Sequence, residues 1–96
     1  MSLRILISHD DADMDAADDL ATLFRAAFSD ADVVTSALPR GTSTSDAAAW
    51  FRQELARADV VAALLTRASA SAQEVAFQLG AGWALGKRLA LVVTPG

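Results

Sequence analysis

The sequence predicts an α/β fold in which a parallel sheet is covered by helices on both faces. Short apolar segments typical of strands alternate along the chain with longer segments whose apolar residues recur at helical spacing. Strands that alternate with helices favour right-handed crossovers and a parallel sheet. Residues 60–65 and 89–93 are apolar without interruption, which is typical of strands buried on both faces.

Length and composition indicate one domain and exclude several classes of protein. The chain has 96 residues, so we expect residues 1–96 to form a single domain. Its net charge of −4 leaves no basic stripe that would bind nucleic acid. The longest apolar run, residues 60–65, is far shorter than the roughly 20 residues that span a membrane. Since the chain also has no cysteine and no signal peptide at its start, we expect a cytoplasmic protein.

The first part of the chain predicts two strands with a helix between them. Residues 3–7 form a short apolar strand, and residues 8–13 form a polar loop rich in residues that cap helices. An amphipathic helix follows over residues 14–28, and a second short strand follows over residues 33–36. We expect four side chains to form the buried face of this helix: Leu20, Leu23, Phe24 and Ala27.

A long loop separates the second strand from the second helix. It runs from Ala37 to Ser45 and is the only extended stretch of Pro, Gly, Ser and Thr in the chain. Long loops inside compact domains are disproportionately functional. The second helix is predicted over residues 46–58 with Thr44 or Ser45 as its N-cap, and residues 60–65 then form a central strand. We expect three side chains of this helix to point inward: Trp50, Phe51 and Leu55.

The remainder of the chain, from Ser71 onward, predicts a long helix, a stop at Gly86 and a buried strand over residues 89–93. We expect Gly86 to be a left-handed C-cap, and Lys87 and Arg88 to complement the negative end of the helix dipole. Small residues in the helix let its axis approach the sheet closely. We expect one apolar stripe to face the core: Val75, Leu79, Gly82 and Trp83.

This order of elements also predicts where a ligand would bind. A flavodoxin-like, doubly wound sheet with four strands in the order 2-1-3-4 binds ligands at the carboxyl ends of its strands, beside the switch point between the first and third strands. That edge is expected to hold Ser8 after the first strand, Ser36 at the end of the second, and the start of the third helix. Four further candidates fall in the same neighbourhood: His9, Arg40, Glu74 and Gln78.

Each candidate also has an ordinary structural interpretation. Glu74 and Gln78 are four residues apart, so they share one face of the third helix, either at the ligand edge or in solvent. Ser8 and His9 either cap the loop after the first strand or line a pocket. Arg40 either binds a phosphate or a partner's carboxylate, or it is a solvated residue at the tip of its loop.

Three further patterns narrow the chemistry. Trp50 either packs in the core or stacks on a ligand. A single histidine, His9, does not build a histidine-rich metal site, so we expect no metal. The turn after the first strand, Ser8-His9-Asp10-Asp11, lacks the glycines of a dinucleotide-binding Rossmann unit.

Three segments carry more specific motifs: RILISHDDAD, VVTSALPRGTSTSDAAAWFRQELARADVVAALLT and QLGAGWALGK. The first combines a strand with Ser-His and an Asp-rich start of a helix. The second combines a strand-to-helix loop with Ala-Asp-Val-Val and an apolar strand. In these segments, which together span essentially the whole chain, the sequence resembles a bacterial TIR domain of the Toll/interleukin-1 receptor family.

The resemblance has a consequence for the end of the fold. The family continues with one more helix, strand and helix, so the chain would lack these elements after Pro95-Gly96, by truncation or as a short variant. Residues 89–93 would then be left as an open apolar edge.

The resemblance implies two activities. TIR domains associate with one another through the loop that corresponds to the one from Ala37 to Ser45, and many bacterial and plant members cleave NAD at the nicotinamide-ribose bond. In the family, a carboxylate on the third helix is the key catalytic residue, thought to engage the ribose hydroxyls. A carboxylate there stabilises the positive charge that develops as the bond breaks.

The chain departs from the family at this position, because Gln78 stands where the family has glutamate. A neutral carboxamide forms hydrogen bonds with ribose but supplies no negative charge. Glu74 lies one turn earlier on the same face, about 6 Å away by helix rise. Such a displacement is large compared with catalytic tolerances of roughly 1 Å.

We therefore expect a TIR-like signalling and self-association module with a nucleotide-binding cleft that is weak or inactive in NAD cleavage. The first alternative is an NAD glycohydrolase that uses Glu74. The second is an enzyme like the nucleoside deoxyribosyltransferases, which have a similar Glu-Leu-Gly-x-Ala-x-Ala-Leu-Gly-Lys ending and also act on N-glycosidic bonds. No cofactor is expected, NAD is a potential substrate, and the expected partners are other TIR domains or a second copy of the chain.

Overall fold

The computed structural model describes residues 3–36, 43–66 and 73–93 of the chain. These residues form a four-stranded sheet in which every neighbouring pair of strands is parallel, in the order β2-β1-β3-β4. The predicted alternation of strands and helices and the predicted strand order are confirmed. The elements are β1 (Arg4–Ser8), α1 (Met14–Ala27), β2 (Asp32–Thr35), α2 (Thr44–Arg57), β3 (Val60–Leu65), α3 (Gln73–Ala84) and β4 (Arg88–Val93), with a 3-10 helix over Asp11–Asp13 before α1.

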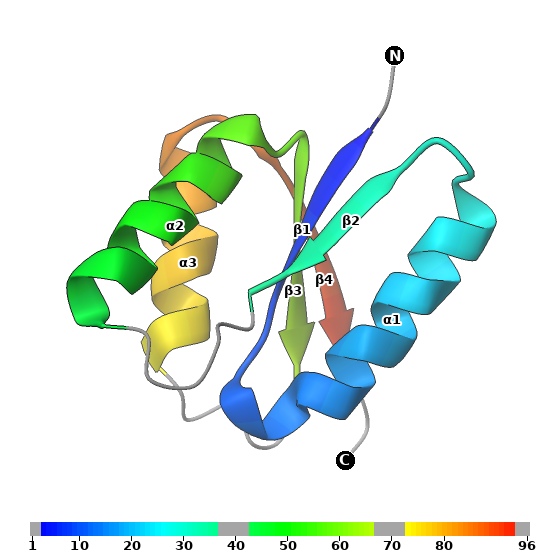
Figure 1. The fold of residues 1–96 in the computed structure, drawn as a ribbon, viewed down its shortest axis with the longest axis horizontal. Helices are drawn as coiled ribbons and strands as arrows, with labels where there is room; N and C mark the ends of the chain where they lie inside the picture. The colour runs from blue at the N-terminus through cyan, green and yellow to red at the C-terminus, as the bar shows by residue number, and fades with distance from the viewer. Residues whose placement is uncertain (1–2, 37–42, 67–72, 94–96) are drawn as a thin grey trace.

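The helices cover the two faces of the sheet unequally. Helix α1 lies on one face, and α2 and α3 lie together on the other (Figure 1). The strands end, and the helices begin, at the same edge of the sheet, which is at the bottom of Figure 1. Within the three described ranges, no helix is long and apolar enough to cross a membrane.

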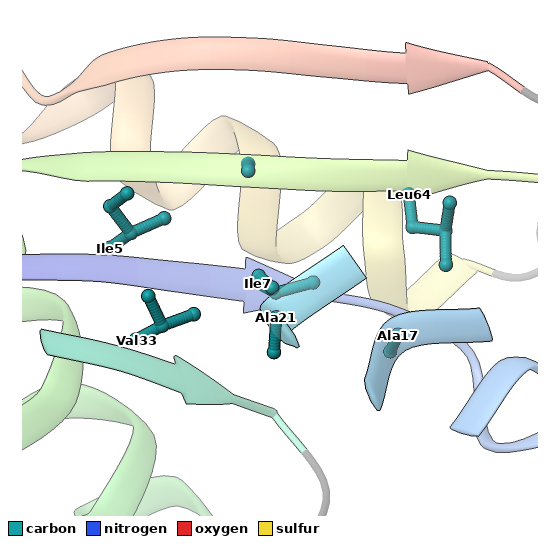
Figure 2. Close-up of a cluster of buried hydrophobic side chains, with 7 residues drawn as sticks. Ile5, Ile7, Ala17, Ala21, Val33 and Leu64 are labelled. Atoms are coloured by element: carbon teal, nitrogen blue, oxygen red, sulfur yellow. The ribbon is translucent and has the colours of Figure 1, made fainter. Parts of the chain in front are cut away.

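The core between α1 and the sheet is built on small residues of the helix. Ala17 and Ala21 are buried completely or nearly so, and they bring the helix close to the strands (Figure 2). The prediction for the buried face was wrong for Leu23, which is 65% exposed, and for Ala27. The helix is turned so that its alanines, flanked by partly buried Leu20 and Phe24, face the sheet. The strands contribute Ile5, Ile7, Val33, Ala62 and Leu64.

The core on the other face joins α2 and α3 to the two central strands. It contains Leu6, Leu55, Ala58 and Val61, against which Val34, Trp50, Phe51 and Ala81 pack. Helix α2 starts two residues earlier than predicted, since the N-cap is Ser43, whose hydroxyl accepts a hydrogen bond from the Asp46 backbone N–H at 3.1 Å. The predicted N-caps, Thr44 and Ser45, are helical residues instead.

Arg4 ties three elements together at the amino edge of the sheet. Its guanidinium forms ion pairs with Asp32 of β2 and Glu54 of α2, and its backbone N–H donates to Asp59 at 2.9 Å. The hydrogen bond with Glu54 raises the pKa of Arg4, against the opposing effect of burial. Because the carboxylate of Glu54 is also mostly buried, Arg4 fixes the ends of β1, β2 and α2 relative to one another.

The turn after α3 follows the prediction closely. Gly86 has a φ of 71°, the left-handed conformation expected of a C-cap. The Gly86 N–H donates to the Trp83 carbonyl and the Lys87 N–H donates to the Gly82 carbonyl, both at 3.0 Å, which is the Schellman pattern. The Lys87 ammonium was expected at the end of α3, but it donates to the Ala56 carbonyl near the end of α2 at 3.1 Å.

Two predictions about this part of the chain were wrong. Trp83 was expected in the core but is 75% exposed, because Gly82 is the residue that faces the sheet. Strand β4 was expected to be covered on both faces, but it is an edge strand in which Leu91 is 58% and Val93 is 69% exposed. An uninterrupted apolar run therefore predicted the strand correctly but did not show whether the strand is central or at the edge of the sheet.

The two helical glycines of α3 give a matched test of this packing. A Cβ at Gly82 would lie 3.2 Å from Leu89 Cδ2 and 3.3 Å from Val61 Cγ2, whereas a Cβ at Gly80 meets nothing within 4 Å. We expect Gly82→Val to lower the free energy of unfolding by about 1–3 kcal/mol through overpacking. Gly80→Val should change it by no more than about 0.5 kcal/mol, because valine and glycine have similar helix propensities. Urea unfolding measures both, and equal effects would contradict a close approach at Gly82.

Candidate functional site

Polar side chains from four elements meet at the carboxyl edge of the sheet. Ser8 ends β1, Ser36 directly follows β2 and Thr66 directly follows β3. Gln78 reaches the same edge from the first half of α3. The sequence predicted Ser8, Ser36 and Gln78 at this edge, and the hydrogen bonds described below join these residues across elements that are far apart in the chain.

The hydrogen bond between Ser8 and Gln78 is the most buried polar contact at this edge. Ser8 is 0% and Gln78 is 6% exposed, and the Ser8 hydroxyl donates to the Gln78 Oε1. Gln78 therefore points at the end of β1 and not into solvent, which decides between the two interpretations of this residue. A buried hydrogen bond of this kind fixes the orientation of the carboxamide.

His9 is held by its backbone and by one ring nitrogen. The Ser36 hydroxyl accepts from the His9 N–H at 3.1 Å and donates to the His9 carbonyl at 3.4 Å. The ring Nδ1 lies 2.8 Å from the Asp10 carbonyl, which only accepts, so in the neutral ring Nδ1 carries the proton. Nε2 is then an acceptor. It is buried and has no hydrogen-bond partner in the described part of the chain.

An unpartnered buried acceptor is unusual and calls for a donor. His9 as a whole is only 3% exposed and its Nε2 is buried, so the ring is held in place by the surrounding structure. A hydroxyl or N–H group of a ligand, or a bound water, would satisfy it. His9 thus combines a backbone held by Ser36 with a ring nitrogen that has no partner among the described residues.

Sequence reasoning missed one contact at this edge. The Thr66 hydroxyl donates to Asp13 Oδ2 at 2.6 Å and so links the end of β3 to the start of α1. These two positions flank the switch point between β1 and β3, where doubly wound sheets bind ligands. The sequence placed Asp13 only in the capping loop at residues 8–13, although a polar residue that directly follows a predicted central strand is a usable signal for Thr66.

Of the other predicted site residues, Trp50 packs on the core, and the side chains of Glu74 and Arg40 lie outside the described part of the structure. Trp50 is half-buried and packs against the core cluster beneath α2. Glu74 lies in α3 one turn before Gln78, but its side chain is outside the described part of the structure. Arg40 and residues 37–42 of the predicted functional loop also lie outside the described residues.

Among the residues that the structure describes, no group of three or more His, Cys, Asp or Glu side chains is arranged to hold a metal ion.

Comparisons with known proteins leave the family open. No protein-family model matches the chain, and no curated protein matches it at a significant level. The TIR resemblance therefore remains a hypothesis that rests on the motifs of the sequence.

The contact between Ser8 and Gln78 can be measured directly. We expect a double-mutant cycle of Ser8→Ala and Gln78→Leu to give a coupling free energy of about 1 kcal/mol, the typical net value of a buried neutral hydrogen bond. A control cycle combines Ser45→Ala, which removes an exposed hydroxyl on α2, with Gln78→Leu. Their effects on the free energy of unfolding should be additive within roughly 0.5 kcal/mol. Additivity of Ser8→Ala with Gln78→Leu in urea unfolding would show that the contact contributes nothing.

Proposed function

We propose that the chain is a TIR-like assembly module that binds a nicotinamide nucleotide such as NAD at the carboxyl edge of its sheet and cleaves it slowly or not at all. The observation that carries the proposal is the placement of Gln78, a buried carboxamide bonded to Ser8 at this edge. Position 78 is the position at which the resemblance implies a catalytic carboxylate.

The binding part of the proposal follows from the groups at the edge. Ribose presents hydroxyls that donate and accept hydrogen bonds, and His9 Nε2 is a buried acceptor without a partner among the described residues. Ser36 and the Ser8–Gln78 pair supply further neutral polar groups nearby. Binding in a crevice at the carboxyl ends of the strands is also the general rule for open α/β sheets.

The weakness of cleavage follows from the charge of residue 78. Breaking the bond between nicotinamide and ribose develops positive charge on the sugar, which a nearby carboxylate stabilises. Gln78 is neutral at every physiological pH, so it offers this charge only the partial negative end of an amide dipole. Removal of one preorganised electrostatic group from an active site costs on the order of 10²–10³ in rate.

The assembly part of the proposal rests on the resemblance and on the anchoring of the predicted loop. Ser43 caps α2, so the far end of the loop is attached to a helix whose inner face packs on the core. A loop positioned by a rigid scaffold is a common carrier of recognition. Its partners would be other TIR domains or a second copy of the chain.

One alternative enzyme is supported by a position in the structure, because Glu74 lies one turn before Gln78 in α3. An NAD glycohydrolase that uses Glu74 would need its substrate displaced along the helix by about 6 Å, the rise of four residues. The two candidates differ in the carboxylate on which cleavage depends.

Nicotinamide release from NAD separates them. We expect calorimetry to detect NAD binding to the wild-type protein, with very slow release of nicotinamide. Gln78→Glu should raise the release rate about 10²–10³-fold, since it supplies a charge where positive charge develops. The matched control Gln53→Glu makes the same change on the exposed surface of α2 and should leave the rate unchanged.

Two results would overturn this proposal. Rapid release by the wild-type protein that Glu74→Ala abolishes would establish the alternative enzyme. If neither the wild-type protein nor the Gln78→Glu variant binds NAD, although circular dichroism shows that both are folded, the proposed nucleotide binding is wrong.

A further inference from the structure

Exposed large apolar side chains gather at one corner of the molecule. Of the eight such side chains among the described residues, five belong to α3, β4 and the turn between them. They are Trp83, Leu85, Leu89, Leu91 and Val93, with exposures of 75%, 60%, 37%, 58% and 69%. A concentration of this kind indicates an interaction surface.

Strand β4 contributes both backbone and side chains to this corner. It is the outer strand beside β3, so the described structure leaves one side of its backbone without a neighbouring strand. Successive side chains of a strand alternate between faces. Leu89 lies next to Gly82 of α3, so Leu89, Leu91 and Val93 all face the side of the sheet that carries α3.

Helix α3 adds Trp83 to the same surface. Gly82 faces Val61 of β3 and Leu89 of β4, and Ala81 packs toward the core cluster beneath α2. Neighbouring residues of a helix lie about 100° apart, so Trp83 is on the opposite side of Gly82 from Ala81. Trp83 therefore lies on the side of α3 that faces the free edge of β4.

We propose that β4 pairs with β4 of a second copy of this chain, antiparallel and centred on Leu91, to form a two-fold symmetric dimer with a continuous eight-stranded sheet. Directly opposite residues in an antiparallel pair lie on the same face of the sheet. A centre at Leu91 places Leu91 opposite Leu91, and Leu89 opposite Val93, of the second copy. The three exposed apolar side chains of each β4 are then buried against one another.

Charge favours the same register. Arg88 is the only charged residue of β4. With Leu91 at the centre, the two Arg88 side chains lie at opposite ends of the paired strands, about 20 Å apart at roughly 3.4 Å per residue. Like charges that face each other directly across a strand pair are destabilising, and this register avoids them.

The helices fit the same arrangement. Gly82 contacts both β3 and β4, so α3 lies above the line between these strands. The two copies of α3 would therefore be separated by about two strand spacings, or roughly 10 Å, at a spacing of about 4.8 Å. This separation matches the ordinary distance of about 8–10 Å between packed helix axes, with Trp83 of each copy between the helices.

A second copy is favoured over open-ended stacking because the two edges of the sheet differ. The other edge, β2, has four residues and begins with the exposed Asp32, which is paired with Arg4. Short edge strands that carry charge resist further pairing. Among the described strands, pairing of β4 with β4 joins the two apolar edges and leaves only β2 edges outside, so the assembly closes at two copies. This dimer does not depend on the ligand site.

Sedimentation with charge-swapped variants tests the dimer. We expect a wild-type dimer, and Leu91→Lys and Leu91→Glu should each weaken dimerisation at least about 100-fold by placing like charges opposite each other. An equimolar mixture of the two variants should dimerise, because the centre of the interface then pairs opposite charges. The control Leu23→Lys makes the same change at a leucine of α1 that is 65% exposed, and should remain a dimer.

Engineered cysteines test the register, since the chain has none of its own. Leu91→Cys should form a covalent dimer on mild oxidation, because residue 91 faces its own copy. Ala90→Cys should not, because residue 90 faces residue 92. A disulfide requires Cα atoms within about 7 Å, which only a directly opposed pair on the dyad provides.

Several outcomes would overturn the inference. They are a monomer at all concentrations, a polydisperse wild-type assembly, a Leu91→Lys dimer, or cross-linking of Ala90→Cys as fast as Leu91→Cys. Association that Arg40→Glu abolishes while Leu91→Lys leaves it intact would assign self-association to the loop at residues 37–45. That result would contradict the β4 interface and would leave the proposed assembly function intact.

Discussion

The fold depends on the burial of two adjacent parallel strands, β1 and β3. Ile7, Val61 and Ala63 are completely buried, with side chains on both faces of the sheet. Such strands need helices on both faces, and a chain that alternates strand and helix supplies them through right-handed crossovers. The direction of winding changes between β1 and β3, so α1 covers one face while α2 and α3 cover the other (Figure 1).

The same constraint creates the candidate site. The ends of β1 and β3 lie side by side at the point where the direction of winding reverses, which is where doubly wound sheets bind ligands. Polar groups there form hydrogen bonds with one another across elements: Ser8 with Gln78, the His9 backbone with Ser36, and Thr66 with Asp13, whereas His9 Nε2 has no partner among the described residues. At the opposite edge the polar contacts are ion pairs of Arg4, which hold the scaffold together. The two edges thus differ in their contacts, with hydrogen bonds of hydroxyl groups at the carboxyl edge and ion pairs at the amino edge.

The sequence predicted the topology because alternation of apolar segments is a coarse signal that small errors in boundaries do not disturb. It also placed Ser8 and Ser36 correctly at one edge, since the strand order determines that edge, but it left Gln78 either at that edge or in solvent, because spacing alone does not show which face of α3 is buried. It misplaced Trp83, because helical periodicity does not show which of two neighbouring residues faces the core. The structure shows that Gly82 faces the sheet, since α3 approaches the strands closely there. The partner of Thr66 could not be predicted, because that contact joins residues 53 positions apart.

The central claim is that the edge around the buried Ser8–Gln78 pair binds a nucleotide. Titration of the isotope-labelled protein with NAD, followed by two-dimensional NMR, tests it residue by residue. The account predicts that the backbone amides of His9 and Ser36 and the side-chain amide of Gln78 shift together with one dissociation constant. Shifts confined to the amino edge around Arg4 and Lys87, or no shifts at saturating NAD, would contradict it.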